Sequence, residues 1–175
     1  MIDENNDISV RTMQESDIDY FSDAFAKLGW SCRKDTLTLY FREQNASERD
    51  VLIAEYKGVA AGYITLIPNA KIGPFCGKNI PEIKDFIVLP SYRWRGIGSF
   101  LMDSIEAVAK SKCNQITLGV GLYTDYGSAQ RMYVKRGYIP DGSGVWYGDK
   151  NLTPYESCIN DDDLNLYFVK QFDRD

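Results

Sequence analysis

The turn that precedes an amphipathic helix holds the residues of this chain that are best suited to chemistry. Residues 88–99 read VLPSYRWRGIGS, so a strand runs through a short turn into a helix, with Gly96 and Gly98 at the helix start. The first N–H groups of a helix have no partner within it, and the helix dipole adds partial positive charge there. Glycines let an anion approach the backbone, and Arg93 and Arg95 add charge. This pattern predicts a diphosphate site.

Two other glycine-containing segments do not match known phosphate-binding patterns. Residues 73–79 (GPFCGKN) have only three residues between their glycines and no Ser or Thr after Lys78, so they are not a P-loop. Residues 119–121 (GVG) are followed by Thr124 where a dinucleotide-binding fingerprint has its third glycine. The prediction of a diphosphate site therefore depends on residues 93–99.

The composition excludes several kinds of catalysis. The chain of 175 residues has no His, so His-dependent triads, His metal sites and imidazole acid–base chemistry are excluded. Its four Cys are too widely spaced for a zinc site and too few for a disulfide scaffold, so we expect no metal and reduced thiols in a cytoplasmic protein. Catalysis must then depend on carboxylates, Tyr, Cys, Lys or backbone dipoles.

Charge is distributed unevenly along the chain. Residues 1–140 hold 17 basic and 17 acidic side chains, whereas residues 141–175 hold three basic and eight acidic ones, which accounts for the net charge of −5. A nucleic-acid-binding protein needs a basic face, so we expect no nucleic acid partner. No stretch approaches the roughly 18 apolar residues of a membrane span, and the acidic N-terminus differs from a secretory signal, so we expect no membrane partner.

Apolar periodicity predicts an alternation of strands and helices. Strands are expected near residues 8–11, 51–56, 59–67, 82–89, 115–120, 138–147 and 164–169, and helices near 16–28, 34–43, 97–110 and 128–136. Ser16 is expected to cap the first helix. This order implies a mixed α/β (α+β) fold, in which helices pack on a central sheet. The length suits a single domain over residues 1–175, with a core at about 8–170.

The chain resembles the GNAT superfamily of acetyl-CoA-dependent N-acetyltransferases. Residues 93–98 (RWRGIG) match the signature R/Q-x-x-G-x-G/A in every fixed place. A second family motif, A-x-x-x-Y-x-x-x-G-F/Y, is matched by Ala129, Tyr133, Gly137 and Tyr138. The element order also agrees, so the resemblance covers about residues 8–170. One departure is Tyr126, where many members carry Asn.

The resemblance implies both the sheet and the cosubstrate. A GNAT-like sheet is mixed and mostly antiparallel, has about seven strands with flanking helices, and splays open as a cofactor cleft. Acetyl-CoA is the expected cosubstrate, and its pantetheine arm is expected to bind backbone groups of Phe86, Ile87 and Val88. The residues expected to hold its diphosphate are Arg93, Trp94, Arg95, Gly96, Ile97, Gly98 and Ser99. Lys135 and Arg136 are candidates for the outer phosphate, and a surface role near the helix end is an equal alternative.

Tyr133 and Glu82 are the catalytic residues that the resemblance implies. An amine can attack a thioester directly, so no covalent enzyme intermediate is needed. Tyr133, with a reference pKa of about 10 against about 8.5 for a thiol, can donate a proton to the leaving sulfur. Glu82 is the favoured base, with Asp85 or water as alternatives, and the Val88 N–H is the expected oxyanion donor.

The predicted activity is acetyl transfer from acetyl-CoA to a primary amine of a small cationic molecule. The segment before the last strand contains Asp149, Glu156, Asp161, Asp162 and Asp163, which would attract cations if they border the acceptor. A solvated acidic loop is the simpler interpretation of these residues. An acyl-CoA-binding regulatory module without turnover is the alternative function. The sequence leaves open the acceptor, a small molecule or a protein, and whether the chain forms a homodimer.

Overall fold

A computed structural model describes residues 7–173 of the chain. The elements in chain order are β1 (Ile8–Thr12), α1 (Ser16–Lys27), α2 (Lys34–Asn45), β2 (Asp50–Tyr56), β3 (Val59–Ile67), β4 (Glu82–Val88), α3 (Ile97–Lys110), β5 (Gln115–Gly121), α4 (Gly127–Lys135), β6 (Ile139–Tyr147), β7 (Lys150–Asn151) and β8 (Leu164–Gln171). They form two compact units, one of residues up to Leu66 with Asp85–Ala107, the other of Ile67–Lys84 with residues from Val108 onward. The single-domain organisation stays a prediction.

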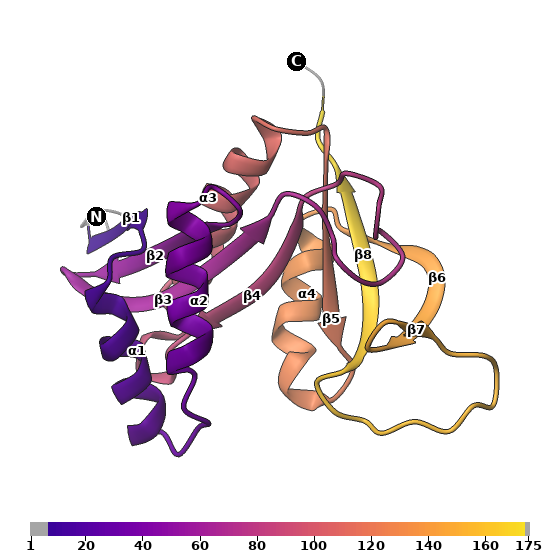
Figure 1. The fold of residues 1–175 in the computed structure, drawn as a ribbon, viewed down its shortest axis with the longest axis horizontal. Helices are drawn as coiled ribbons and strands as arrows, with labels where there is room; N and C mark the ends of the chain where they lie inside the picture. Colours follow the sequence, from indigo (N-terminus) through magenta and orange to yellow (C-terminus); the bar gives the residue numbers. More distant parts are fainter. Residues whose placement is uncertain (1–6, 174–175) are drawn as a thin grey trace. The chain divides into compact units, whose positions relative to one another are not determined.

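In the first unit, strands neighbour one another in the order β1-β2-β3-β4. The first two of these pairings are antiparallel. Helices α1 and α2 cover one face of the strands (Figure 1). Apolar side chains at helical spacing face alternating apolar side chains of the strands, which gives an apolar core. The members of this core that are at most 1% exposed are Phe21, Phe25, Leu37, Val51, Ile53 and Tyr63.

Successive residues of β4 point to opposite faces of the first unit. Ile87 packs against the core beneath α1 and α2. The ring of Phe86 instead lies beside Gly98, the second residue of α3, where an added Cβ would be 3.3 Å from its tip. This is the two-residue alternation of a strand, and it sets the start of α3 against the opposite face of β4.

The predicted cap of α1 is wrong. Glu15 occupies the N-cap position without a side-chain hydrogen bond, and Ser16 is already helical. The Asp17 carboxylate accepts the Gln14 N–H at 2.7 Å and two bonds from the Arg11 guanidinium at 2.7 and 2.8 Å. An ionised carboxylate bonded to a guanidinium outcompetes a serine hydroxyl, because charge-assisted hydrogen bonds are about twice as strong as neutral ones.

In the second unit, the strand order is β4-β5-β8-β6-β7. The parallel ladder of β4 with β5 comprises two pairs, Glu82 with Thr117 and Ile83 with Leu118. The other neighbours, β5 with β8, β8 with β6, and β6 with β7, are antiparallel. The predicted mixed, mostly antiparallel sheet with flanking helices is confirmed, and the eighth strand is the two-residue β7.

The irregular segment 68–80 packs on β8. Ala70 and Phe75 form a small core with Tyr167 of β8, and the Phe75 and Tyr167 rings meet edge to face at 6.3 Å. Between β7 and β8 the chain forms a wide loop, which contains most of the acidic residues noted above (Figure 1). The four cysteines are free, as expected. Among residues 7–173, no helix is both long and apolar enough to cross a membrane.

Candidate active site

The turn between β4 and α3 contains two residues with a left-handed backbone. Trp94 and Gly96 both adopt left-handed conformations, with φ of 64° and 80°. Alternation of left-handed with other residues directs neighbouring N–H groups to one side, as in anion-binding nests. The Trp94 side chain is 94% exposed, so no packing energy compensates for its left-handed backbone. An added Cβ on Gly96 would meet no atom within 4 Å. The backbone is therefore open to an incoming group at this position.

The start of α3 offers further N–H groups at the same turn. The Phe100 N–H bonds to the Gly96 carbonyl at 3.0 Å. The N–H groups of the helical residues before Phe100 therefore have no acceptor within the helix. The Arg93 Nε donates to the Val88 carbonyl at 3.1 Å. The Arg95 guanidinium lies 5.1 Å from the centre of the Tyr56 ring. Arg93 and Arg95 thus each make one contact beside the turn, where their charge favours an anion.

The backbone of Phe86–Val88 is held by close contact with β3. An added Cβ on Gly62 of β3 would lie 2.5 Å from the Ile87 carbonyl oxygen, so a side chain there would displace β4. The Leu89 N–H bonds to the Ala61 carbonyl at 2.9 Å. The close approach fixes the segment that the family resemblance assigns to the pantetheine arm.

Asp85 of β4 accepts three hydrogen bonds on one carboxylate oxygen. Its Oδ2 lies 2.6 Å from Arg33 Nη2, 3.0 Å from the Tyr63 hydroxyl and 3.2 Å from the Tyr40 hydroxyl. Arg33 also donates to the Tyr63 hydroxyl at 2.9 Å. Burial and then the charge of Asp85 raise the pKa of Tyr40 to about 12, and the same two causes raise the pKa of Tyr63. Both tyrosines therefore stay protonated donors at neutral pH.

Tyr133 lies on the buried face of α4. Its side chain is 6% exposed, and its ring packs on Tyr138 at a centroid distance of 5.8 Å. Burial raises the pKa of Tyr133 above its ordinary value of 10. Because burial disfavours the phenolate, the hydroxyl keeps its proton at neutral pH. It can therefore donate a proton, as the predicted role requires.

Glu82 is the first residue of β4 and is 1% exposed. The Lys84 ammonium lies 3.5 Å from its Oε1. Deep burial of a carboxylate is uncommon, because removing its charge from water is costly unless partners compensate. The predicted base is thus a buried carboxylate beside a cation and not a surface group at a strand end.

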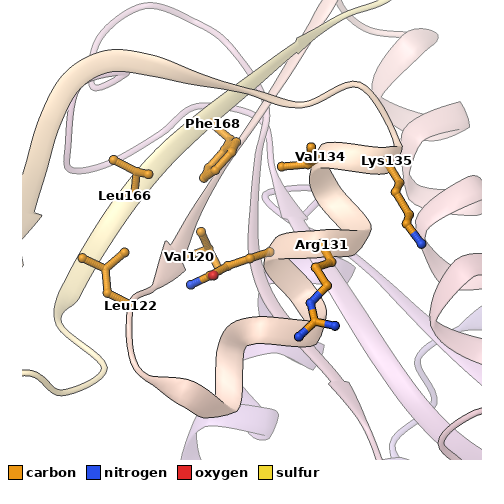
Figure 2. A pocket seen from close by; sticks show the side chains of 8 residues that line it. Val120, Leu122, Arg131, Val134, Lys135, Leu166 and Phe168 are labelled. Atoms are coloured by element: carbon orange, nitrogen blue, oxygen red, sulfur yellow. The ribbon is translucent and has the colours of Figure 1, made fainter.

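An apolar hollow of about 460 Å³ lies between α4 and the strands β5 and β8. Figure 2 shows Val120, Leu166 and Phe168 directed toward it, whereas the amine of Lys135 points away. Gln130 also lines it, and its side chain donates to the Gly121 carbonyl at 2.8 Å. The lining of the hollow contains no carboxylate or tyrosine, and its polar members are Gln130, Arg131 and Lys135. The hollow contains none of Tyr133, Glu82 and residues 86–99.

Tyr126, which replaces the family's Asn, packs within its own unit. An added Cβ on Gly121 would lie 2.3 Å from the Tyr126 ring, so the ring covers the end of β5. The Tyr126 hydroxyl donates to Asp162 Oδ1 at 2.8 Å, and Tyr123 donates to the same oxygen. Burial and then this bond raise the pKa of Tyr126. The ring and hydroxyl of Tyr126 both have partners in the chain itself.

Several of the acidic residues predicted to attract a cation also bind neighbouring side chains. Asp161 accepts the Tyr147 hydroxyl at 3.1 Å, and Asp162 is bound by the two tyrosines. Glu156 is bound by Lys150, and by the Thr153 N–H at 3.0 Å. These bonds, that of Lys150 first, lower the pKa of Glu156 to about 2. The acidic loop therefore uses much of its charge to fix its own conformation.

Comparison with protein families gives an independent assignment. Residues 10–138, which include the turn at 93–99 and Tyr133, match the acetyltransferase (GNAT) family. The chain belongs to the GNAT family. An uncharacterized N-acetyltransferase of Archaeoglobus fulgidus is 32% identical to this GNAT chain over 106 residues, which are 59% of this chain and 70% of the relative.

Solved structures of other proteins share the fold of this GNAT chain. Ard1 from Thermoplasma volcanium aligns with a TM-score of 0.69 and 19% identity, over 96% of this chain and 99% of that one. The protein yncA of Salmonella typhimurium, solved with its cofactor acetyl-CoA, aligns with a TM-score of 0.68 and 16% identity, over 97% of this chain and 96% of that one. At these identities the likeness establishes the fold alone.

The sequence prediction missed the residues around Asp85. Arg33, Tyr40 and Tyr63 belong to the α1–α2 connection, α2 and β3, and no motif links them. A signal was available in part, since Tyr40 and Tyr63 fall on the predicted apolar faces, where a hydroxyl needs a partner. Within residues 7–173, no group of three or more Cys, Asp or Glu side chains could hold a metal ion.

Proposed function

We propose that this GNAT protein transfers the acetyl group of acetyl-CoA to a primary amine of a small cationic molecule. The amine attacks the thioester carbonyl directly, so a C–N bond forms and the C–S bond breaks. The turn at residues 93–99 is the observation that carries the proposal. Its left-handed Trp94 and Gly96, the open space at Gly96 and the two arginines support the binding of a diphosphate.

Acetyl-CoA supplies the activated acetyl thioester, and the side chains of this protein handle the protons. Glu82 accepts the proton that the acceptor ammonium must lose before attack. The Val88 N–H donates to the carbonyl oxygen as negative charge develops on it. Tyr133 donates its hydroxyl proton to the leaving sulfur, and its raised pKa supports this role because the donor form persists at neutral pH.

The acidic surplus of residues 141–175 supports a cationic acceptor. Tyrosine hydroxyls and Lys150 occupy parts of that charge, but a hydrogen-bonded carboxylate retains its negative charge. Net negative potential raises the local concentration of cations and falls off as salt rises. We therefore expect cationic amines to be better acceptors than neutral amines of the same length.

The test is release of free CoA thiol from acetyl-CoA with a panel of amines, together with calorimetry of CoA binding. Turnover with a cationic amine, and weaker turnover with a neutral one, is the expected result. CoA binding without turnover on any amine would instead support an acyl-CoA-binding regulatory module. Absence of CoA binding to the folded protein would defeat both functions.

A further inference from the structure

Two arginine–aspartate pairs in the first unit differ in how the carboxylate is used. In the Arg11–Asp17 pair, both carboxylate oxygens are bonded. Oδ1 accepts Arg11 Nη2 at 2.8 Å, and Oδ2 accepts Arg11 Nη1 and the Gln14 N–H, each at 2.7 Å. Asp17 is 3% exposed, and its pair joins β1 to the start of α1. This is the pattern of a purely structural ion pair, in which all acceptors are used.

In the Arg33–Asp85 pair, all three donors converge on Oδ2. Among the residues that the structure describes, none donates to Oδ1 of Asp85. The side chain of Asp85 is 13% exposed, whereas the side chain of Asp17, taken without its backbone, is 4% exposed. One carboxylate oxygen is therefore held rigidly, while the other remains available to a donor from outside the chain.

The position of Arg33 is electrostatically unfavourable, which indicates that its partner Asp85 has a role. Arg33 is the N-cap residue of α2, where the positive end of the helix dipole disfavours a cation. It nevertheless turns its guanidinium toward Asp85 and the Tyr63 hydroxyl. Tyr63 is 1% exposed and Tyr40 is 7% exposed, so two buried hydroxyls and a guanidinium fix one carboxylate. Such support preorganises a binding group.

We propose that the open Oδ1 of Asp85 binds a second ammonium of the acceptor, so that the protein prefers diamines over monoamines. This rests on the proposed function. Asp85 precedes Val88 by three residues, or about 10 Å of extended strand. A nitrogen at Oδ1 is thus too far along β4 to be the one that attacks a carbonyl held by the Val88 N–H. The group at Asp85 anchors the acceptor, and a different amine reacts.

The first test compares 1,5-diaminopentane with n-pentylamine, which differ in the second amine alone. In the wild type, kcat/KM should favour the diamine. Asp85→Asn keeps the shape but removes the charge, and should lower kcat/KM for the diamine by roughly 10- to 100-fold, mainly through KM, because a hydrogen bond between charged groups is lost. The ratio of the diamine kcat/KM to the n-pentylamine kcat/KM should therefore fall in this variant. Equal losses for the two amines, or no preference in the wild type, would overturn the proposal.

The matched control is Asp17→Asn, which also removes an aspartate from an arginine in the same unit. It should lower stability without changing the ratio of diamine to monoamine activity. If Asp85→Asn does not fold, Asp85→Glu keeps the ion pair and moves the carboxylate outward by one methylene. This variant should shift the preference toward the shorter 1,4-diaminobutane. An unchanged length preference would contradict the proposal.

A binding readout separates this proposal from the proposed function. Calorimetry of 1,5-diaminopentane with the CoA-loaded protein should detect binding that Asp85→Asn weakens and Asp17→Asn does not. If no amine is acetylated but this pattern is observed, the proposed reaction fails while the ammonium site stands. If amines are acetylated but the diamine binds wild type and Asp85→Asn equally, the ammonium site fails while the reaction stands.

Discussion

Gly96 lies in the turn before α3 and Gly121 is the last residue of β5, and the space beside these two glycines differs. A Cβ on Gly96 in the first unit would meet nothing within 4 Å, whereas a Cβ on Gly121 in the second would lie 2.3 Å from the Tyr126 ring. At Gly121 the protein itself fills the space that the missing side chain leaves. At Gly96 that space is open, as a ligand site requires.

The two units also differ in how exposed the groups suited to binding or proton transfer are. Near Gly96 the groups suited to binding are backbone N–H groups at an exposed turn. In the second unit, the groups suited to proton transfer are the buried side chains of Tyr133 and Glu82. Substitutions in the exposed turn should therefore alter affinity for the cosubstrate, and substitutions of the buried groups should alter turnover.

Tyr133→Phe tests the buried side of this comparison and should have the largest effect. Loss of the hydroxyl removes the proposed donor, so kcat should fall by about 10²–10⁴-fold. Affinity for acetyl-CoA should stay within about threefold, because no binding group is removed. Steady-state kinetics and calorimetry measure the two quantities.

Tyr126→Phe is the control for loss of a tyrosine hydroxyl in the same unit. It removes the bond to Asp162 and should leave kcat within about threefold. Because the pKa of Tyr133 is raised, deprotonation of Tyr133 should not reduce the wild-type rate until the pH exceeds 10. An unchanged kcat in Tyr133→Phe, with chemistry rate-limiting, would remove Tyr133 from the mechanism.

Ser99→Asp tests the exposed turn. Ser99 is an exposed residue in the first turn of α3. A carboxylate there interacts favourably with the positive end of the helix dipole, so the melting temperature should stay the same or rise. The same charge repels a diphosphate a few ångströms away, and acetyl-CoA affinity should fall on the order of 100-fold.

Ser99→Asn is the control for that experiment, because asparagine has the shape of aspartate without its charge. Its affinity for acetyl-CoA should fall much less than that of Ser99→Asp. Tight binding of acetyl-CoA by a folded Ser99→Asp variant would place the diphosphate elsewhere.

Gly121→Ala should reduce stability by about 1–3 kcal/mol, because the added methyl group overlaps the Tyr126 ring. Urea denaturation measures the free energy of unfolding of Gly121→Ala and of the double variant that also carries Tyr126→Ala. Adding Tyr126→Ala should recover part of the loss, since it removes the overlapping ring.

Gly96→Ala is the counterpart in the first unit. It should cost about 1–2 kcal/mol through the left-handed backbone alone. No neighbouring truncation should recover that loss.

The outcome that would contradict the Gly121 prediction is a double variant, Gly121→Ala with Tyr126→Ala, that is no more stable than Gly121→Ala alone. The space beside Gly121 would then not be limited by the Tyr126 ring.

Asp162→Asn should have the smallest effect. It weakens the bonds from Tyr123 and Tyr126 on the exposed loop, and the free energy of unfolding should fall by less than about 1 kcal/mol. Thermal denaturation in low and high salt measures the change. A loss of several kcal/mol would show that the acidic loop stabilises the whole unit.

The elements and the turn between β4 and α3 were predictable because local signals specify them. The helix over residues 97–110 matches α3 at both ends, since apolar periodicity and the Gly pair agree. The cap of α1 was not predictable, because Asp17 depends on Arg11 of β1. The contacts of Asp85 were not predictable either, since Arg33, Tyr40 and Tyr63 come together only in the folded unit.

The acidic loop shows why charge alone gave an incomplete prediction. Composition located the excess of carboxylates but not their partners. Tyr147 and Lys150, which lie within about 15 residues of the carboxylates that they bind, are ordinary surface residues in the sequence. Hydrogen-bond geometry decides which carboxylates are engaged, and sequence spacing in a loop does not determine that geometry.

The chain passes between its two compact units three times, after Leu66, after Lys84 and after Ala107. Each unit is therefore assembled from two separate stretches, and β4 contributes residues to both. A single cut of the backbone cannot release either unit intact, nor can a contiguous gene fragment encode one. We therefore expect half-length fragments not to fold, because neither half of the chain contains all residues of one unit.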